Sequence, residues 1–259
     1  MGAKPSTLTF TAASPFLLSP SSLLLSPFSP FPLLPPSRAL SWYAEAMRLW
    51  KVGPLTLSLL GVLTVVSQIV LELWPEIGPL VSKIVVPLIA CGMLFGAHEA
   101  ASGGTPRLAH ALAAFRAPAG AIAAILVSSS LTFAAEWIAA DALAGVNLLR
   151  PGDPTPDLDA TTVLAIYAAG ILVSLPMSLV PLAALFGGAG FAASFALSGA
   201  AFARHSGAFA LYGAIALALL ALGLLTFGIG LVIALPLIAC ATYAAWRDLL
   251  GPTGSGQAP

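Results

Sequence analysis

Charged side chains are scarce in this sequence. Lys and Arg number 10, Asp and Glu number 10, and together they make up 8% of the chain, against about 25% in an ordinary soluble domain. With no excess of positive charge, a nucleic-acid partner is not expected. Apolar residues make up 59% of the chain and the mean hydropathy is +0.99. This is the composition of a membrane protein.

Cysteine and the usual catalytic motifs are also lacking. The two cysteines, Cys91 and Cys240, lie within long apolar runs, where a thiol behaves as a small hydrophobe rather than as part of a disulfide framework. No two of the histidines His98, His110 and His205 have the i, i+4 spacing of a metal-binding helix, so no metal or other cofactor is expected. Without a Walker loop, a nucleophile elbow or paired catalytic carboxylates, the sequence predicts that the protein is not an enzyme.

Long apolar runs predict an all-α, polytopic membrane helix bundle. Crossing a bilayer takes about 20 apolar residues in a helix, and backbone groups in lipid must be hydrogen-bonded within the protein. Six runs meet this length: 54–71, 79–97, 117–135, 161–182, 208–225 and 229–246. Residues 185–203 form a weaker apolar segment, which is either interfacial or a seventh span. The number of spans is therefore six or seven at this point.

A threefold internal repeat supports six spans. Three segments predict short amphipathic helices in the plane of the interface, and each ends in an aromatic and a basic residue before a span. In the first, Leu40, Tyr43, Met47 and Trp50 recur at helical spacing. The segments are SWYAEAMRLWKVGP (41–54), RLAHALAAFRAPAG (107–120) and SFALSGAAFARHSG (194–207), with the pairs Trp50 and Lys51, Phe115 and Arg116, and Phe202 and Arg204.

The basic ends of these segments predict contact with membrane lipids. Each Lys or Arg near an anionic leaflet contributes about 1 kcal/mol of attraction, and the lipid-headgroup candidates are Arg48, Lys51, Arg116 and Arg204. Cytoplasmic loops are rich in Lys and Arg, and six spans place most cations on one side. We therefore predict that both termini are cytoplasmic. The cations on that side are Lys4, Arg38, Arg48, Lys51, Arg107, Arg116, Arg204 and Arg247, whereas Lys83 and Arg150 face outward.

The alternative function is a small solute or ion transporter or channel. Ionisable groups at membrane depth are functional candidates, and Glu72, Lys83 and Glu136 all map near the outer face, where Lys83 could pair with either acid. Pro176 and Pro181 flank Met177 and Ser178 and predict a break in the fourth span, as in many transporters. The transport-path candidates are Glu72, Lys83, Glu136, Pro176 and Ser178.

Both ends of the chain are set apart from a single membrane domain over residues 38–250. Residues 1–37 are rich in Ser and Pro, and prolines at this density forbid a continuous helix. We interpret them as a disordered tail or as an extension from a misassigned start. Residues 251–259 are predicted to be a second disordered tail.

Several short elements resemble YciC-like bacterial inner-membrane proteins, which are related in architecture to the membrane domain of some glycerophosphodiester phosphodiesterases. The elements are WKVGP (50–54), IGP (77–79), FRAPAG (115–120), FARHSGAFALYG (202–213) and YAAWRDL (243–249). The resemblance implies a multi-pass protein of the bacterial inner membrane with no agreed activity, and it assigns no catalytic residue. Membrane lipids, a second copy of the chain or another membrane protein are the expected partners.

Overall fold

The computed structural model describes residues 34–74, 77–146 and 158–251. Over these residues every regular element is a helix, so the predicted all-α bundle is confirmed. Most of the predicted tails, 1–37 and 251–259, lie outside the described residues, as does Arg150. The described helices belong to one unit, Leu33–Pro259.

Six helical segments in the described part of the chain are long and apolar enough to cross a membrane, as the sequence predicts. Proline starts α3 at its first position, where no backbone donor is lost. The spans are α3 (Pro54–Glu72), α4 (Gly78–Ala101), α5 (Ala119–Ala144), the composite Ala160–Leu185, α9 (Ser206–Leu225) and α10 (Leu231–Leu249). The protein is therefore an integral, multi-pass membrane protein.

The end of the third span is one place where the sequence prediction is wrong. It placed the end at residue 135, before the charge of Glu136, but α5 continues to Ala144. Gly145, with φ of 64°, then ends the helix in the left-handed conformation, which glycine adopts without steric cost. A charged residue lowers the hydropathy of a helix without breaking its backbone hydrogen bonds. The glycine therefore marks the boundary and the charge does not.

The fourth span is interrupted, as its prolines predict. Helix α6 (Ala160–Ser174) is followed by the 3-10 turn η3 (Leu175–Met177) and by α7 (Val180–Leu185). At the start of α6, Asp159 accepts a hydrogen bond from the Thr162 backbone N–H at 2.9 Å and thereby caps the helix. Hydrogen bonds from Thr162, first from its side chain and then from its backbone N–H, lower the pKa of the Asp159 carboxyl.

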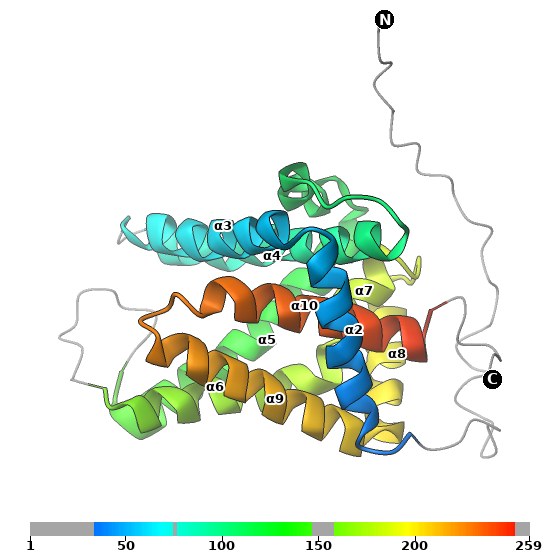
Figure 1. The fold of residues 1–259 in the computed structure, drawn as a ribbon. Helices are drawn as coiled ribbons and strands as arrows, with labels where there is room; N and C mark the ends of the chain where they lie inside the picture. The colour runs from blue at the N-terminus through cyan, green and yellow to red at the C-terminus, as the bar shows by residue number, and fades with distance from the viewer. Residues whose placement is uncertain (1–33, 75–76, 147–157, 252–259) are drawn as a thin grey trace, which may run out of the picture. The chain divides into compact units, whose positions relative to one another are not determined.

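Two helices outside the spans lie at the end of the bundle where α10 terminates. Helix α2 (Arg38–Val52) runs across α10 rather than alongside it, and α8 (Phe191–Arg204) also runs across the direction of the spans (Figure 1). With 14 residues, α8 is about 21 Å long at 1.5 Å per residue, short of the hydrocarbon thickness of about 30 Å. Residues 185–203 therefore do not form a seventh span.

The second predicted amphipathic helix is not an α-helix. Its residues form two 3-10 turns, η1 (Leu108–Leu112) and η2 (Ala114–Arg116). Pro106 and Pro118 bracket this segment and shorten the helix that it can form. Its backbone packs closely on α4, because a Cβ on Gly92 would lie 2.7 Å from the Ala111 Cα.

Helix α2 has two apolar faces. Ala39, Trp42, Ala46 and Leu49 are buried against the bundle, and Trp42 packs on Phe209 and Tyr212 of α9. The predicted stripe lies beside this face, and its Leu40 and Met47 are 55% and 39% exposed. The described chain does not fully cover these two side chains. Their exposure fits a helix that lies in the membrane interface, where lipid would cover them.

Candidate functional site

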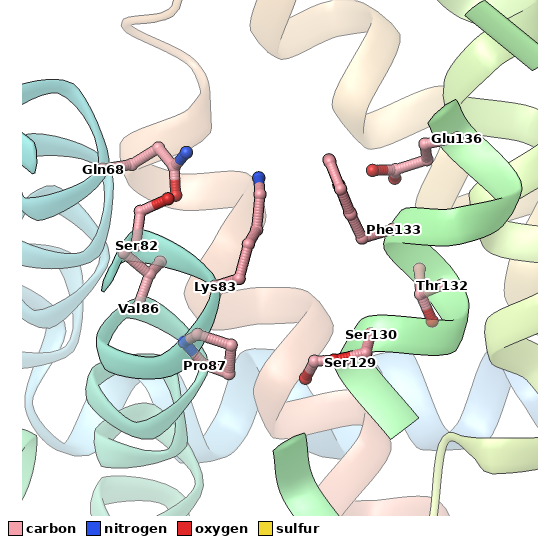
Figure 2. A pocket seen from close by; sticks show the side chains of 10 residues that line it. All are labelled: Gln68, Ser82, Lys83, Val86, Pro87, Ser129, Ser130, Thr132, Phe133 and Glu136. Carbon is pink, nitrogen blue, oxygen red and sulfur yellow. The ribbon is translucent and has the colours of Figure 1, made fainter. Parts of the chain in front are cut away.

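A cavity of about 250 Å³ lies between α3, α4 and α5 (Figure 2). Helical periodicity builds its walls, since residues three and four apart share a face. On α4 this spacing joins Lys83, Val86 and Pro87, and on α5 it joins Ser129, Thr132, Phe133 and Glu136. The other lining residues are Gln68, Ser82 and Ser130.

The ammonium of Lys83 contacts an aromatic ring in this cavity. Lys83 Nζ lies 3.9 Å from the centroid of the Phe133 ring, a cation–π contact that stabilises a partly desolvated charge. Figure 2 shows the ring standing between the Lys83 ammonium and the Glu136 carboxylate. No ion pair between described residues involves Lys83. Lys83 therefore contacts Phe133 rather than pairing directly with Glu72 or Glu136.

Helix α6 adjoins the Glu136 carboxylate at Gly170. A Cβ on Gly170 would lie 2.4 Å from Glu136 Oε1, so only glycine leaves room for the carboxylate there. Pro87, on the opposite wall, has no N–H with which to close the helical hydrogen bond to the Lys83 carbonyl. The residues that line the cavity thus bring together an ammonium and a carboxylate.

Glu72 lies outside the cavity lining. It is exposed at the end of α3 and accepts a hydrogen bond from the amide of Gln68, one turn earlier. Of the three charged transport-path candidates, the structure therefore brings Lys83 and Glu136 to one cavity and leaves Glu72 at its rim.

Pro176 and Ser178 lie apart from this cavity, at the interruption of the fourth span. Ser178 Oγ donates to the Leu175 carbonyl within the same turn. Ser198 of α8 completes the site: its Oγ donates to the Pro176 carbonyl at 2.8 Å and accepts from the Leu179 N–H at 3.2 Å. Ser198 is 1% exposed, so the backbone groups freed by the break are bonded inside the protein.

The four lipid-headgroup candidates differ in their surroundings. Lys51 and Arg116 are exposed, and Arg204 is half-buried at the end of α8. Arg48 is also on the surface but donates to Glu45 at 2.7 Å. Pro106 lies where a Cβ on Gly53 would approach to 3.0 Å, so the end of α2 meets the start of the η1 segment.

A polar cluster that the sequence prediction missed joins α2 to the end of α10. Arg38 and Trp42 both donate to Asp248, and Glu45 accepts from Arg247 at 2.8 Å. The hydrogen bonds with Asp248 raise the pKa of the Arg38 guanidinium above its usual value. Acids among cations on an amphipathic helix, together with the closing RDL of α10, were the available signals. Only the fold shows that they meet.

The histidines serve separate local contacts. His98 stacks on Phe186 with 4.6 Å between ring centroids, and its Nδ1 lies 3.1 Å from the Tyr243 hydroxyl. His110 Nδ1 accepts from the Arg107 N–H, and His205 Nδ1 accepts from the Leu34 N–H, both at 3.3 Å. Within the described ranges, no three His, Cys, Asp or Glu residues gather where they could hold a metal ion.

Comparisons of the chain with protein-family models, with curated proteins and with solved structures find no match. Two places in the described structure are therefore the candidates for function: the cavity between α3, α4 and α5, and the end of the bundle that carries Lys51 and Arg116.

Proposed function

We propose that this integral membrane protein is not an enzyme and that it binds anionic lipid headgroups at the end of the bundle formed by α2, η1 and η2. One observation carries the proposal: exposed cations stand beside exposed apolar side chains at this end. Lys51 adjoins Val52 (46% exposed), and Arg116 adjoins Phe115 (39% exposed). Apolar side chains enter the boundary of the acyl chains while the cations meet phosphates.

The adjoining turn extends the same pattern. Leu108 and Leu112 are 51% and 59% exposed, and Arg107 precedes them on the surface. Each cation near an anionic leaflet contributes about 1 kcal/mol to membrane binding. Apolar side chains that leave water for the acyl-chain boundary strengthen the binding further. Arg48 contributes less to this binding than Lys51, because Glu45 already neutralises part of its charge.

Lipid retention tests this function on the whole protein. The protein is equilibrated in detergent with equal phosphatidylglycerol and phosphatidylcholine, and bound lipid is counted by mass spectrometry. The double variant Lys51→Gln, Arg116→Gln loses preference for phosphatidylglycerol. The charge-conserving control, Lys51→Arg with Arg116→Lys, keeps it. Equal preference in all three proteins would rule out the proposed headgroup site.

The same proposal places the basic end in the cytoplasm of a bacterial cell, with both termini there, in line with the YciC-like resemblance. The exposed cations at this end favour that orientation, and the turn between α9 and α10 lies at the opposite end (Figure 1). In a background with both cysteines replaced by alanine, Ile229→Cys is labelled by an impermeant maleimide on intact cells. Thr105→Cys is labelled only after permeabilisation. The reverse pattern would invert the topology.

Transport of a small solute is a second candidate, favoured by the cavity between α3, α4 and α5. Lys83 and Glu136 face it from within spanning segments, where ionisable groups commonly mark substrate paths. Flux into proteoliposomes, compared between the wild type and Glu136→Gln, tests this candidate. Absence of flux for anions, cations and neutral solutes alike would argue against it.

A further inference from the structure

We infer that the cavity between α3, α4 and α5 binds a zwitterionic group, one that carries an ammonium together with a phosphate or a carboxylate. This inference goes beyond headgroup binding at the α2 end and does not depend on it. It also holds whether or not the bound group is moved across the membrane.

The anionic part of the ligand is assigned to Lys83. Its ammonium reaches into the cavity and lies over Phe133, a contact that leaves its N–H donors available to an oxyanion. Ser129 and Ser130 line the same wall, and in the described part of the chain neither hydroxyl has a hydrogen-bond partner. The hydroxyl of Thr132, in contrast, donates to the Ser128 carbonyl. Figure 2 shows both serines on the Pro87 side of the cavity, away from the Lys83 ammonium, so their hydroxyls remain for other polar atoms of the ligand.

The ammonium part of the ligand is assigned to Glu136. The carboxylate lies on the side of the Phe133 ring away from Lys83 (Figure 2). An ammonium there contacts both the carboxylate and the second ring face, as ligand cations do in aromatic sites. Gly170 of α6 leaves room for the carboxylate in this position, because a Cβ there would lie 2.4 Å from Glu136 Oε1.

Charge balance explains why the ligand carries both signs. A charge at membrane depth is costly unless it is paired, and the Phe133 ring stands between Lys83 and Glu136. A simple anion would leave Glu136 unpaired, and a simple cation would leave Lys83 unpaired. A zwitterion satisfies both and adds no net charge. The volume of about 250 Å³ lies just under the usual range for drug-sized ligands and suits a headgroup or a small amphoteric molecule.

Two sources supply this chemistry: the headgroup of an ethanolamine phospholipid, and a free solute such as phosphoethanolamine or an amino acid. Binding to the full-length protein in detergent is measured by native mass spectrometry with three probes. These are short-chain phosphatidylethanolamine, phosphoethanolamine and short-chain phosphatidylglycerol. Binding of the phospholipid alone identifies a lipid site, and binding of both ethanolamine compounds identifies a solute site. Either result supports the inference.

Variants locate the binding. Lys83→Gln and Glu136→Gln each weaken binding of the zwitterion about tenfold, the effect of losing one charge-assisted contact. Phe133→Leu keeps both charges but lets them approach each other, and it also weakens binding. The control Asp141→Asn removes an exposed carboxylate of α5 that lies outside the lining and leaves binding unchanged. The double variant Lys51→Gln, Arg116→Gln also leaves it unchanged, which separates this site from the proposed headgroup site.

Three results would overturn the inference. In the first, phosphatidylglycerol binds as tightly as phosphatidylethanolamine. In the second, the wild type and Glu136→Gln bind the zwitterionic probe with equal affinity. In the third, neither ethanolamine compound binds. Folding of each variant is checked by its elution as a single species and by an unchanged melting temperature. Glu136→Gln differs least from the wild type in shape, so it decides the question if Lys83→Gln fails to fold.

Discussion

Arg38 and Asp248 are 210 positions apart in the chain and meet in a two-point ion pair. Arg38 Nε donates to Asp248 Oδ2 at 2.8 Å, and Nη2 donates to Oδ1 at 2.5 Å. Trp42 Nε1 also donates to Oδ2, at 2.9 Å. This forked geometry gives a stronger and more directional contact than a single surface ion pair. It fastens the first described helix to the last.

Asp248→Asn should destabilise the protein, because an amide cannot accept all three hydrogen bonds. Both side chains are partly exposed, so solvent screening limits the loss to about 1–2 kcal/mol. Thermal unfolding in detergent measures it. Arg48→Gln is the matched control, since it breaks an exposed i, i+3 pair that contributes only a few tenths of a kcal/mol. Equal melting temperatures for the two variants would contradict the prediction.

Ser198→Ala should destabilise the interruption of the fourth span. It leaves the Pro176 carbonyl and the Leu179 N–H without their partner in a buried place, at about 1–3 kcal/mol for each unsatisfied group. Ser194→Ala is the control on the same helix, because Ser194 bonds only the carbonyls of Ala189 and Gly190, just before its own helix. Denaturation of both variants in the same detergent makes the comparison. A loss no larger than that of the control would refute the assigned role.

Gly92→Ala and Gly120→Ala should have opposite effects. At Gly92 the new methyl would lie 2.7 Å from the Ala111 Cα, a backbone atom that cannot move aside, whereas nothing lies within 4 Å at Gly120. Alanine in place of glycine stabilises the middle of a helix by about 0.5–1 kcal/mol, and we expect a smaller gain at Gly120, in the first turn of α5. Gly92→Ala should therefore lower the melting temperature, and Gly120→Ala should hold or raise it. A tolerated Gly92→Ala would show that η1 does not pack closely on α4.

Acid should destabilise the protein partly through His205. Burial lowers the pKa of His205 below 6.5, and Arg204 adds to this shift while Asp248 opposes it. A depressed histidine pKa means that the folded state resists protonation, so stability is full above 6.5 and falls as the pH drops through the lower folded pKa. Protonation also removes the Nδ1 acceptor of the Leu34 N–H.

The variant His205→Asn tests this contribution, since its amide oxygen still accepts a hydrogen bond but does not titrate. Between about pH 7 and pH 5, where histidine changes charge, its melting temperature should fall less than that of the wild type. His110→Asn should act in the same direction, because burial also lowers the pKa of His110. Parallel curves for the wild type and both variants would exclude this source of acid sensitivity.

Hydropathy and proline positions were enough to predict the spans. An apolar run must leave water whatever its neighbours are, so six crossings follow from local sequence, and Pro176 breaks its helix because it lacks an N–H. The segment 107–120 shows the limit of such patterns. Its aromatic and basic end is as predicted, but its backbone forms 3-10 turns whose packing depends on Gly92 of another helix.

The sequence by itself determined that this chain has six segments long and apolar enough to cross a membrane, because the length and hydropathy of a run are local properties. Only the tertiary structure decided which charges meet. It joined Arg38 to Asp248, placed Phe133 between Lys83 and Glu136, and separated Pro176 from their cavity. Such contacts depend on how helices far apart in the chain approach and rotate, and no single helix encodes that geometry.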